Sequence, residues 1–220
     1  MRLDKFTAAH DDSQRLISQA RLSMRAAVCV LAVFGALICD ARASAHPRAR
    51  RVILVNHDRQ ISPWALARGA RALTLQVNQD LRAWWPGPSV IVTTAKSAAG
   101  ARWRVTIAAA NVNAPEPGLH GDNQHGVWAL VYPSGGLAWT WAASHELLEM
   151  LEDPTTNVRS DGFQREVCDP VENIGYYDDG DIVSDFVTPA YFHLGSKGPW
   201  DYLDSITTAP TGLEILELNP

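Results

Sequence analysis

The chain has 220 residues and a net charge of −5, with 24 acidic side chains against 19 basic ones and three cysteines. Basic side chains are concentrated in residues 46–120 and acidic ones in residues 121–220. An acidic half repels nucleic acid and attracts cations, so we expect no nucleic acid as a partner and favour a cation site.

Residues 24–45 have the three parts of a secretory signal peptide. Met24 and Arg25 start it, an apolar run follows, and Ala43-Ser44-Ala45 supplies a cleavage site between small residues. The apolar run of about 14 residues is too short to cross a bilayer comfortably, so we expect a secreted or periplasmic protein with no stable membrane insertion after cleavage near Ala45. Residues 1–23 lack a core pattern and are expected to be disordered or untranslated, with Met24 as the alternative start.

Cleavage leaves residues 46–220, which is enough for a single domain with its own core. Cys29 and Cys39 depart with the signal peptide, so only Cys168 remains and no internal disulfide can form. We divide this domain into an N-terminal part, 52–154, and a C-terminal part, 155–220.

The apolar patterns of the N-terminal part predict a strand, a helix and three further strands. Residues 52–56 are a β-rich apolar run, as in a buried strand. A helix is expected to begin at Ser62-Pro63, a capping residue followed by a proline of the first turn, and to end near Trp85. The later strands are expected at 89–94, 102–108 and 126–132, separated by a loop over 111–124.

A second helix is expected around His145, and Pro154 ends it. The chain beyond is loop-rich, with a hairpin turn at Asp178-Asp179-Gly180 before a strand over 182–187. These elements predict an α+β fold: a small mixed sheet with a backing helix and a site-bearing helix, followed by a loop-rich C-terminal part.

The second helix carries the residues of chemical interest. His145 and Glu149 are four residues apart and therefore share a helix face, and both side-chain types are ordinary zinc ligands. In an H-E-x-x-H helix the glutamate next to the first histidine acts as the general base, which here is Glu146. Glu149 replaces the second histidine, giving H-E-x-x-E.

This replacement bears on catalysis. A carboxylate ligand adds negative charge to the ion and makes it a weaker Lewis acid than two neutral imidazoles would. The alternative to a metal site is a solvated helix face. The apolar residues on both sides of His145-Glu146 argue for a buried helix instead, where unpaired carboxylates would be costly.

The helix and two later segments resemble known sequences. The order of elements and the H-E-x-x segment resemble the small zincin metallopeptidases. More closely, Ser144–Pro154 (SHELLEMLEDP), Glu166–Pro170 (EVCDP) and Val183–Ala190 (VSDFVTPA) resemble a family of uncharacterised bacterial and phage proteins with S-H-E-x-x-E-x-x-x-D-P helices. The resemblance implies a zincin-like fold, covers roughly residues 140–205 closely, and brings no established activity with it.

Further site residues are expected outside the helix. Because zincins commonly recruit a third ligand from beyond the helix, Glu166 and Asp169 are the first choices. His120 and His125, just before the fourth strand, are candidates for lining the cleft, although surface positions explain them as well. Tyr177 is a candidate for stabilising an oxyanion, with packing as the alternative.

We therefore expect a secreted zinc-dependent metallopeptidase acting on a peptide or protein substrate. The alternative is a catalytically inactive zincin-like protein that binds metal or acts as a surface or phage-associated binding protein. A third hypothesis is an enzyme that uses the acidic cluster to bind another hard cation, such as calcium or manganese.

Overall fold

Five strands form a mixed sheet in the order β2-β1-β3-β5-β4, and the computed structural model that contains it describes residues 49–109, 116–133, 138–155 and 165–211. The expected signal peptide lies outside these residues. The chain from Pro47 onward forms one compact unit. Within the described ranges, no helix has the length and apolar character needed to cross a membrane.

The strands are β1 (Arg50–Asn56), β2 (Val90–Ala95), β3 (Trp103–Ile107), β4 (Gly118–Asn123) and β5 (Gly126–Val131). All neighbouring pairs are parallel except β4 and β5, which form an antiparallel hairpin at one edge. The prediction of a loop over 111–124 was wrong for Gly118–Asn123. These residues lack a strand-like apolar pattern and owe their conformation to pairing with β5.

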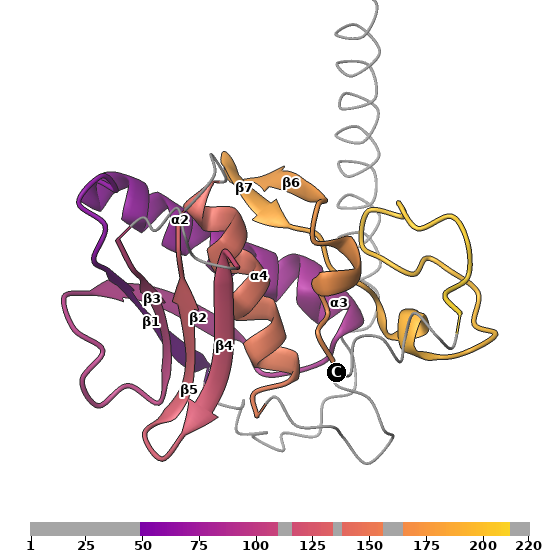
Figure 1. The fold of residues 1–220 in the computed structure, drawn as a ribbon, viewed down its shortest axis with the longest axis horizontal. Coiled ribbons are helices and arrows are strands. Elements are labelled where there is room, and N and C mark those ends of the chain that lie inside the picture. Colours follow the sequence, from indigo (N-terminus) through magenta and orange to yellow (C-terminus); the bar gives the residue numbers. More distant parts are fainter. Residues whose placement is uncertain (1–48, 110–115, 134–137, 156–164, 212–220) are drawn as a thin grey trace, which may run out of the picture. The chain divides into compact units, whose positions relative to one another are not determined.

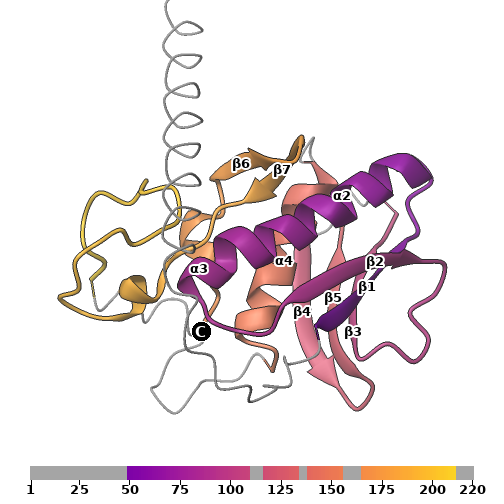
Figure 2. The ribbon, with the colours of Figure 1, turned by 180° about the vertical axis from the view of Figure 1, so that it is seen from behind.

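Two helices cover one face of this sheet (Figures 1 and 2). Helix α2 (Pro63–Leu75) packs against β2, α4 (Trp139–Glu152) packs against β4 and β5, and the two helices touch each other. Alternate strand residues bury their side chains beneath them, including Val52, Leu54, Val105 and Ile107. The α+β prediction, with a mixed sheet, a backing helix and a second helix, is confirmed at this level.

The predicted start of the first helix is confirmed. Ser62 is its N-cap, its hydroxyl accepts a hydrogen bond from the backbone N–H of Ala65, and Pro63 occupies the first turn. The helix continues through a π-helical stretch, Gln76–Leu81 (η1), into the short α3 (Arg82–Trp84). Gly69 lies within helix α2, at a position where a Cβ would be 2.6 Å from Cζ2 of Trp139 on α4. The absence of a side chain at this position therefore allows the two helices to cross closely.

A second layer of chain covers the helices on their other side. Strands β6 (Gly175–Asp178) and β7 (Asp181–Ser184) form an antiparallel hairpin, and β7 packs on both α2 and α4. Its turn is the one predicted, with Asp179 and Gly180 both at positive φ. Two short 3-10 helices, Asp169–Val171 (η2) and Pro189–Phe192 (η3), lie in the segments before and after this hairpin.

Candidate metal centre

Helix α4 supplies three of the predicted site residues. His145 and Glu149 lie one turn apart, with Nε2 of the histidine 3.3 Å from Oε2 of the glutamate. Glu146 and Glu149 are only 4% and 3% exposed, which is rare for carboxylates unless they are paired or hold an ion. The i, i+4 spacing of His145 and Glu149 therefore brings their side chains together, as predicted from the sequence.

A buried polar network fixes the start of this part of the helix. The hydroxyl of Ser144 donates to the side-chain carbonyl of Gln76 on η1 and accepts from the backbone N–H of Ser184 on β7. The Gln76 amide donates to the carbonyl of Ser184, which closes the network. These hydrogen bonds hold η1, α4 and β7 together at the residue before His145. They thereby fix the backbone from which the His145 side chain extends.

The segment after the helix reaches back to the same residues. The backbone N–H of Cys168 donates to Oε1 of Glu149, and Oδ1 of Asp169 lies 3.1 Å from Nε2 of His145. A backbone hydrogen bond from Val187 to the carbonyl of Val167 anchors this segment in the core. Asp169 is thus placed directly against the predicted histidine.

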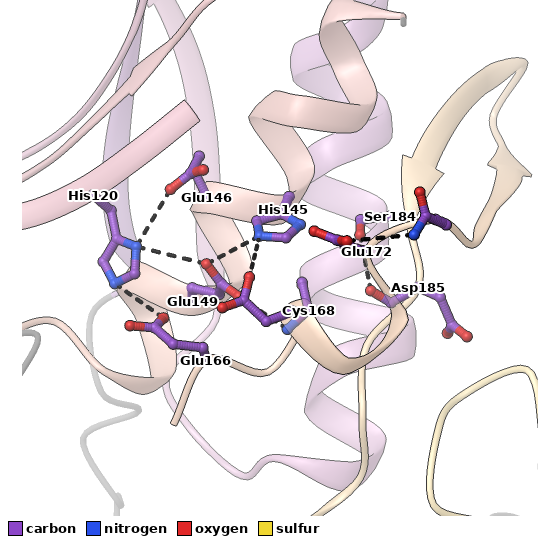
Figure 3. A network of polar contacts seen from close by, with 11 residues as sticks. His120, His145, Glu146, Glu149, Glu166, Cys168, Glu172, Ser184 and Asp185 are labelled. Carbon is purple, nitrogen blue, oxygen red and sulfur yellow. Dashed lines mark hydrogen bonds and ion pairs between the residues drawn. The ribbon is translucent and has the colours of Figure 1, made fainter. Parts of the chain in front are cut away.

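Strand β4 brings in a residue that the sequence placed only among cleft candidates. The His120 ring lies among three carboxylates: Nδ1 is 3.3 Å from Oε2 of Glu146 and 3.7 Å from Oε2 of Glu149, and Nε2 is 3.6 Å from Oε2 of Glu166 (Figure 3). Its side chain is 5% exposed. His120 therefore links the helix to the Glu166 segment.

The close approach of strand β4 to helix α4 explains why position 118 is a glycine. A Cβ on Gly118 would lie 2.6 Å from Cγ of Glu146 and closer still to Oε1, well inside van der Waals contact. Only a residue without a side chain allows Glu146 to extend along the strand toward His120.

The ionisation of both histidines follows from these neighbours. Burial opposes the charged form of His120, but the hydrogen bond with Glu146 and the charges of Glu149 and Glu166 prevail and raise its pKa to about 9. Burial likewise opposes the charged form of His145, and Glu149 and Asp169 raise its pKa well above the ordinary value. Both rings therefore hold a proton at neutral pH where no cation takes its place.

The pKa values of a carboxyl and a thiol group are also raised, but here burial is the cause and favours the neutral form. Burial raises the pKa of Glu146, and the hydrogen bond from His120 only partly offsets this effect. Burial also raises the pKa of Cys168 well above its ordinary value, helped by the charge of Glu149. The cysteine is thus a buried thiol in the absence of a cation.

These side chains line a pocket of about 790 Å³. Its walls come from β4 and the residues before it, from α4 and from the segment around η2. The lining includes all five predicted catalytic and metal residues, His145, Glu146, Glu149, Glu166 and Asp169. The structure therefore brings this set together, and adds His120 to it.

The other two candidates, His125 for the cleft and Tyr177 for an oxyanion, lie outside this pocket. His125 is at the β4–β5 turn and lines a different pocket, together with His57 and Lys96. Tyr177 is on β6 with 71% of its surface exposed and does not line the metal pocket. Because residues 111–124 were predicted to form a loop, the prediction did not separate His120, which lies within strand β4, from His125, which lies beyond the end of that strand.

Two groups of side chains have the composition and spacing of metal ligands. His145, Glu149 and Cys168 form one, and His120, Glu149 and Glu166 form the other; within each, one ligand atom per residue lies within 4.8 Å of the others. Imidazole, thiolate and carboxylate are the ligand types of zinc sites. These residues could hold a cation, and Glu149 belongs to both groups.

Comparison with family models, with curated proteins and with solved structures gave no match.

Proposed function

We propose that this chain is a metal-dependent hydrolase of zincin-like design that cleaves peptide bonds, with zinc as its cation. The observation that carries the proposal is that the carboxylates of Glu149 and Asp169 both approach Nε2 of His145, with Glu146 in the same pocket. Nε2 of His145 lies 3.3 Å from Glu149 and 3.1 Å from Asp169. Ligands of one tetrahedral zinc ion, each about 2.0–2.1 Å from it, are roughly 3.3 Å apart.

The donor set also fits a cation by its charge. Six carboxylates line the pocket; those of Glu146, Glu149 and Glu166 are buried, and those of Glu116, Asp169 and Glu172 are exposed. Burying several like charges together is costly without a counter-charge. His145, Glu149 and Asp169 would hold the ion, which when bound supplies a Lewis acid to polarise a substrate carbonyl.

Glu146 is the proposed general base. Its Oε2 is fixed by the hydrogen bond with Nδ1 of His120, which leaves Oε1 to take a proton from a water molecule in the pocket. Burial raises its pKa toward the working pH, and general bases are most effective when the two are close. His120 thereby acts as a positioning residue for the base.

An extended peptide is the substrate class that the pocket walls favour. In the part of the chain that the structure describes, β4 is the last strand of the sheet and no strand pairs with its outer edge. Gly118, Leu119 and His120 of this strand line the pocket. A peptide laid along this edge would gain main-chain hydrogen bonds and bring its carbonyls toward Glu146.

The test is hydrolysis of a quenched fluorescent peptide library by zinc-loaded protein, with metal content measured in parallel. Glu146→Gln should abolish cleavage while zinc is retained, because the amide cannot take a proton. Glu172→Gln, which alters an exposed carboxylate of the same pocket, is the matched control and should keep both. Peptidase activity is ruled out if zinc-loaded wild-type protein cleaves no member of the library.

A metal-binding protein without catalysis is the second candidate, and one observation favours it. Glu149 in place of a second histidine leaves a strongly anionic ligand set, which weakens the ion as a Lewis acid. Retention of zinc without any cleavage would support this candidate over the first.

A further inference from the structure

His120 is buried in a way that its hydrogen bonds do not account for. Its side chain is 5% exposed, yet Nε2 has no hydrogen-bond partner among the described residues. Leaving a buried polar atom unsatisfied costs about 1–3 kcal/mol. This nitrogen lies beside the pocket carboxylates, 3.6 Å from Oε2 of Glu166, which is too long for a hydrogen bond (Figure 3).

The distances around this nitrogen suit a shared ion better than a direct bond. A separation of 3.6 Å between Nε2 of His120 and Oε2 of Glu166 is close to the roughly 3.3 Å expected for two ligands of one tetrahedral ion. The other ring nitrogen, Nδ1, faces Oε2 of Glu146 at 3.3 Å. A histidine that binds metal through one nitrogen commonly donates its other N–H to a carboxylate, and this is the arrangement found.

Glu149 lies between this position and the one around His145. Its Oε2 is 3.3 Å from Nε2 of His145 and 3.7 Å from Nδ1 of His120, and one of its ligand atoms lies within 4.8 Å of a ligand atom of His120 and of Glu166. Each histidine belongs to a different ligand group, and Glu149 is the residue common to both. A carboxylate has two oxygens with several lone pairs, so one glutamate can serve two ions.

Charge gives an independent reason for a second ion. The four carboxylates that contact the two histidines, Glu146, Glu149, Glu166 and Asp169, carry four negative charges when ionised, and one divalent cation balances half of them. Two divalent cations would balance all four carboxylates with both rings neutral.

We propose that the pocket binds two divalent cations, one at His145, Glu149 and Asp169 and the second at His120, Glu149 and Glu166. The second position rests on the metal-dependent hydrolase proposed above and extends it from a one-metal to a two-metal site. Paired ions clamp both the attacking and the leaving atoms in hydrolytic enzymes. A second cation would also compensate for the weak Lewis acidity that Glu149 imposes on the first.

Metal stoichiometry tests the proposal without any need for activity. Full-length protein is stripped with a chelator, dialysed, and titrated with zinc by calorimetry, and the bound metal is counted by elemental analysis. We expect two zinc ions per chain in the wild type. Glu149→Gln should weaken both, whereas His120→Gln and Glu166→Gln should each leave one.

The matched control is His125→Gln, which removes a histidine in the turn after the same strand but outside the pocket and should leave two ions. Circular dichroism checks that each variant is folded, and the Glu166 variant keeps the test decisive if the His120 variant unfolds. Manganese gives a second readout, since two ions sharing a carboxylate produce an exchange-coupled spectrum in electron paramagnetic resonance.

The outcomes separate the two proposals. One zinc ion in the wild type, lost in His145→Gln and kept in His120→Gln, would overturn the two-metal site while leaving the hydrolase proposal in place. No zinc bound in the wild type would overturn both. A drop of at least about 100-fold in affinity for the second ion in both the His120 and Glu166 variants would support the inference.

Discussion

The contact between Gly118 and Glu146 gives a prediction that can be worked out from the structure in detail. A Cβ at position 118 would lie 2.6 Å from Cγ of Glu146, whereas unstrained carbon atoms approach to roughly 3.5 Å. Gly118→Ala must therefore displace the Glu146 side chain or strand β4 by about 1 Å. Overpacking of this kind costs typically about 1–3 kcal/mol of the free energy of unfolding.

A double-mutant cycle isolates this contact. In a Glu146→Ala background the side chain that clashes is gone, so Gly118→Ala should cost almost nothing there. The expected coupling energy is about 1–3 kcal/mol, far above the roughly 0.5 kcal/mol scatter of independent sites. Gly121→Ala is the control on the same strand, because its Cβ would meet only the Trp128 ring at 3.3 Å and its effect should be equal in both backgrounds.

The assay is urea unfolding of metal-free protein, followed by tryptophan fluorescence and analysed by linear extrapolation. Equal costs of Gly118→Ala in the two backgrounds would refute the placement of Glu146 against β4. In zinc-loaded protein the same substitution should lower peptide hydrolysis by about 100-fold, because a shift of about 1 Å misplaces the base. Zinc content should remain unchanged.

Three further outcomes are expected. Burial and the hydrogen bond with Asp201 raise the pKa of Asp185 from 3.8 to about 8, so the folded chain holds a proton between about pH 4 and 8 that the unfolded chain has released. The free energy of unfolding should therefore fall by up to about 1.4 kcal/mol per pH unit as pH rises through this window, and Asp185→Asn should flatten the slope, as pH-dependent urea unfolding can show. Arg82→Met should cost about 3–5 kcal/mol in urea unfolding, because it removes the guanidinium 2.5 Å from the carboxylate of Glu152, whose side chain is only 12% exposed. A cost below about 1 kcal/mol would show that this ion pair does not stabilise the fold. Zinc at a hundredfold excess over its Kd should stabilise the folded chain by about 2.7 kcal/mol in thermal unfolding, and a chelator should reverse the gain; an unchanged Tm would contradict a metal site.

Features that depend on neighbours in the sequence could be predicted from it. Ser62 and Pro63 marked the start of α2, and the Asp-Gly turn at residues 179–180 marked the β6–β7 hairpin, because capping and turn geometry depend on a few adjacent residues. The same holds for His145 and Glu149, whose convergence follows from the helix repeat alone.

Strand β4 and the role of His120 could not be predicted in this way. Gly118–Asn123 has no apolar alternation, and it is a strand because β5 pairs with it. His120 meets Glu146 and Glu166 across separations of 26 and 46 positions in the chain, which no local pattern encodes. Likewise, the need for glycine at Gly69 and Gly118 is apparent only from the helix or side chain that packs against each of them.

By itself the sequence determined the α+β class and the helix that carries His145, Glu146 and Glu149, because these follow from periodicity, capping and spacing along the chain. Glu166 and Asp169 were expected only from the resemblance of the later segment to known sequences. Only the tertiary structure decided that an edge strand brings a buried histidine among those carboxylates, since sheet pairing joins residues whose separation in the sequence carries no signal. The physical reason is that local conformation is set by adjacent residues, whereas a binding site is set by which distant surfaces pack together.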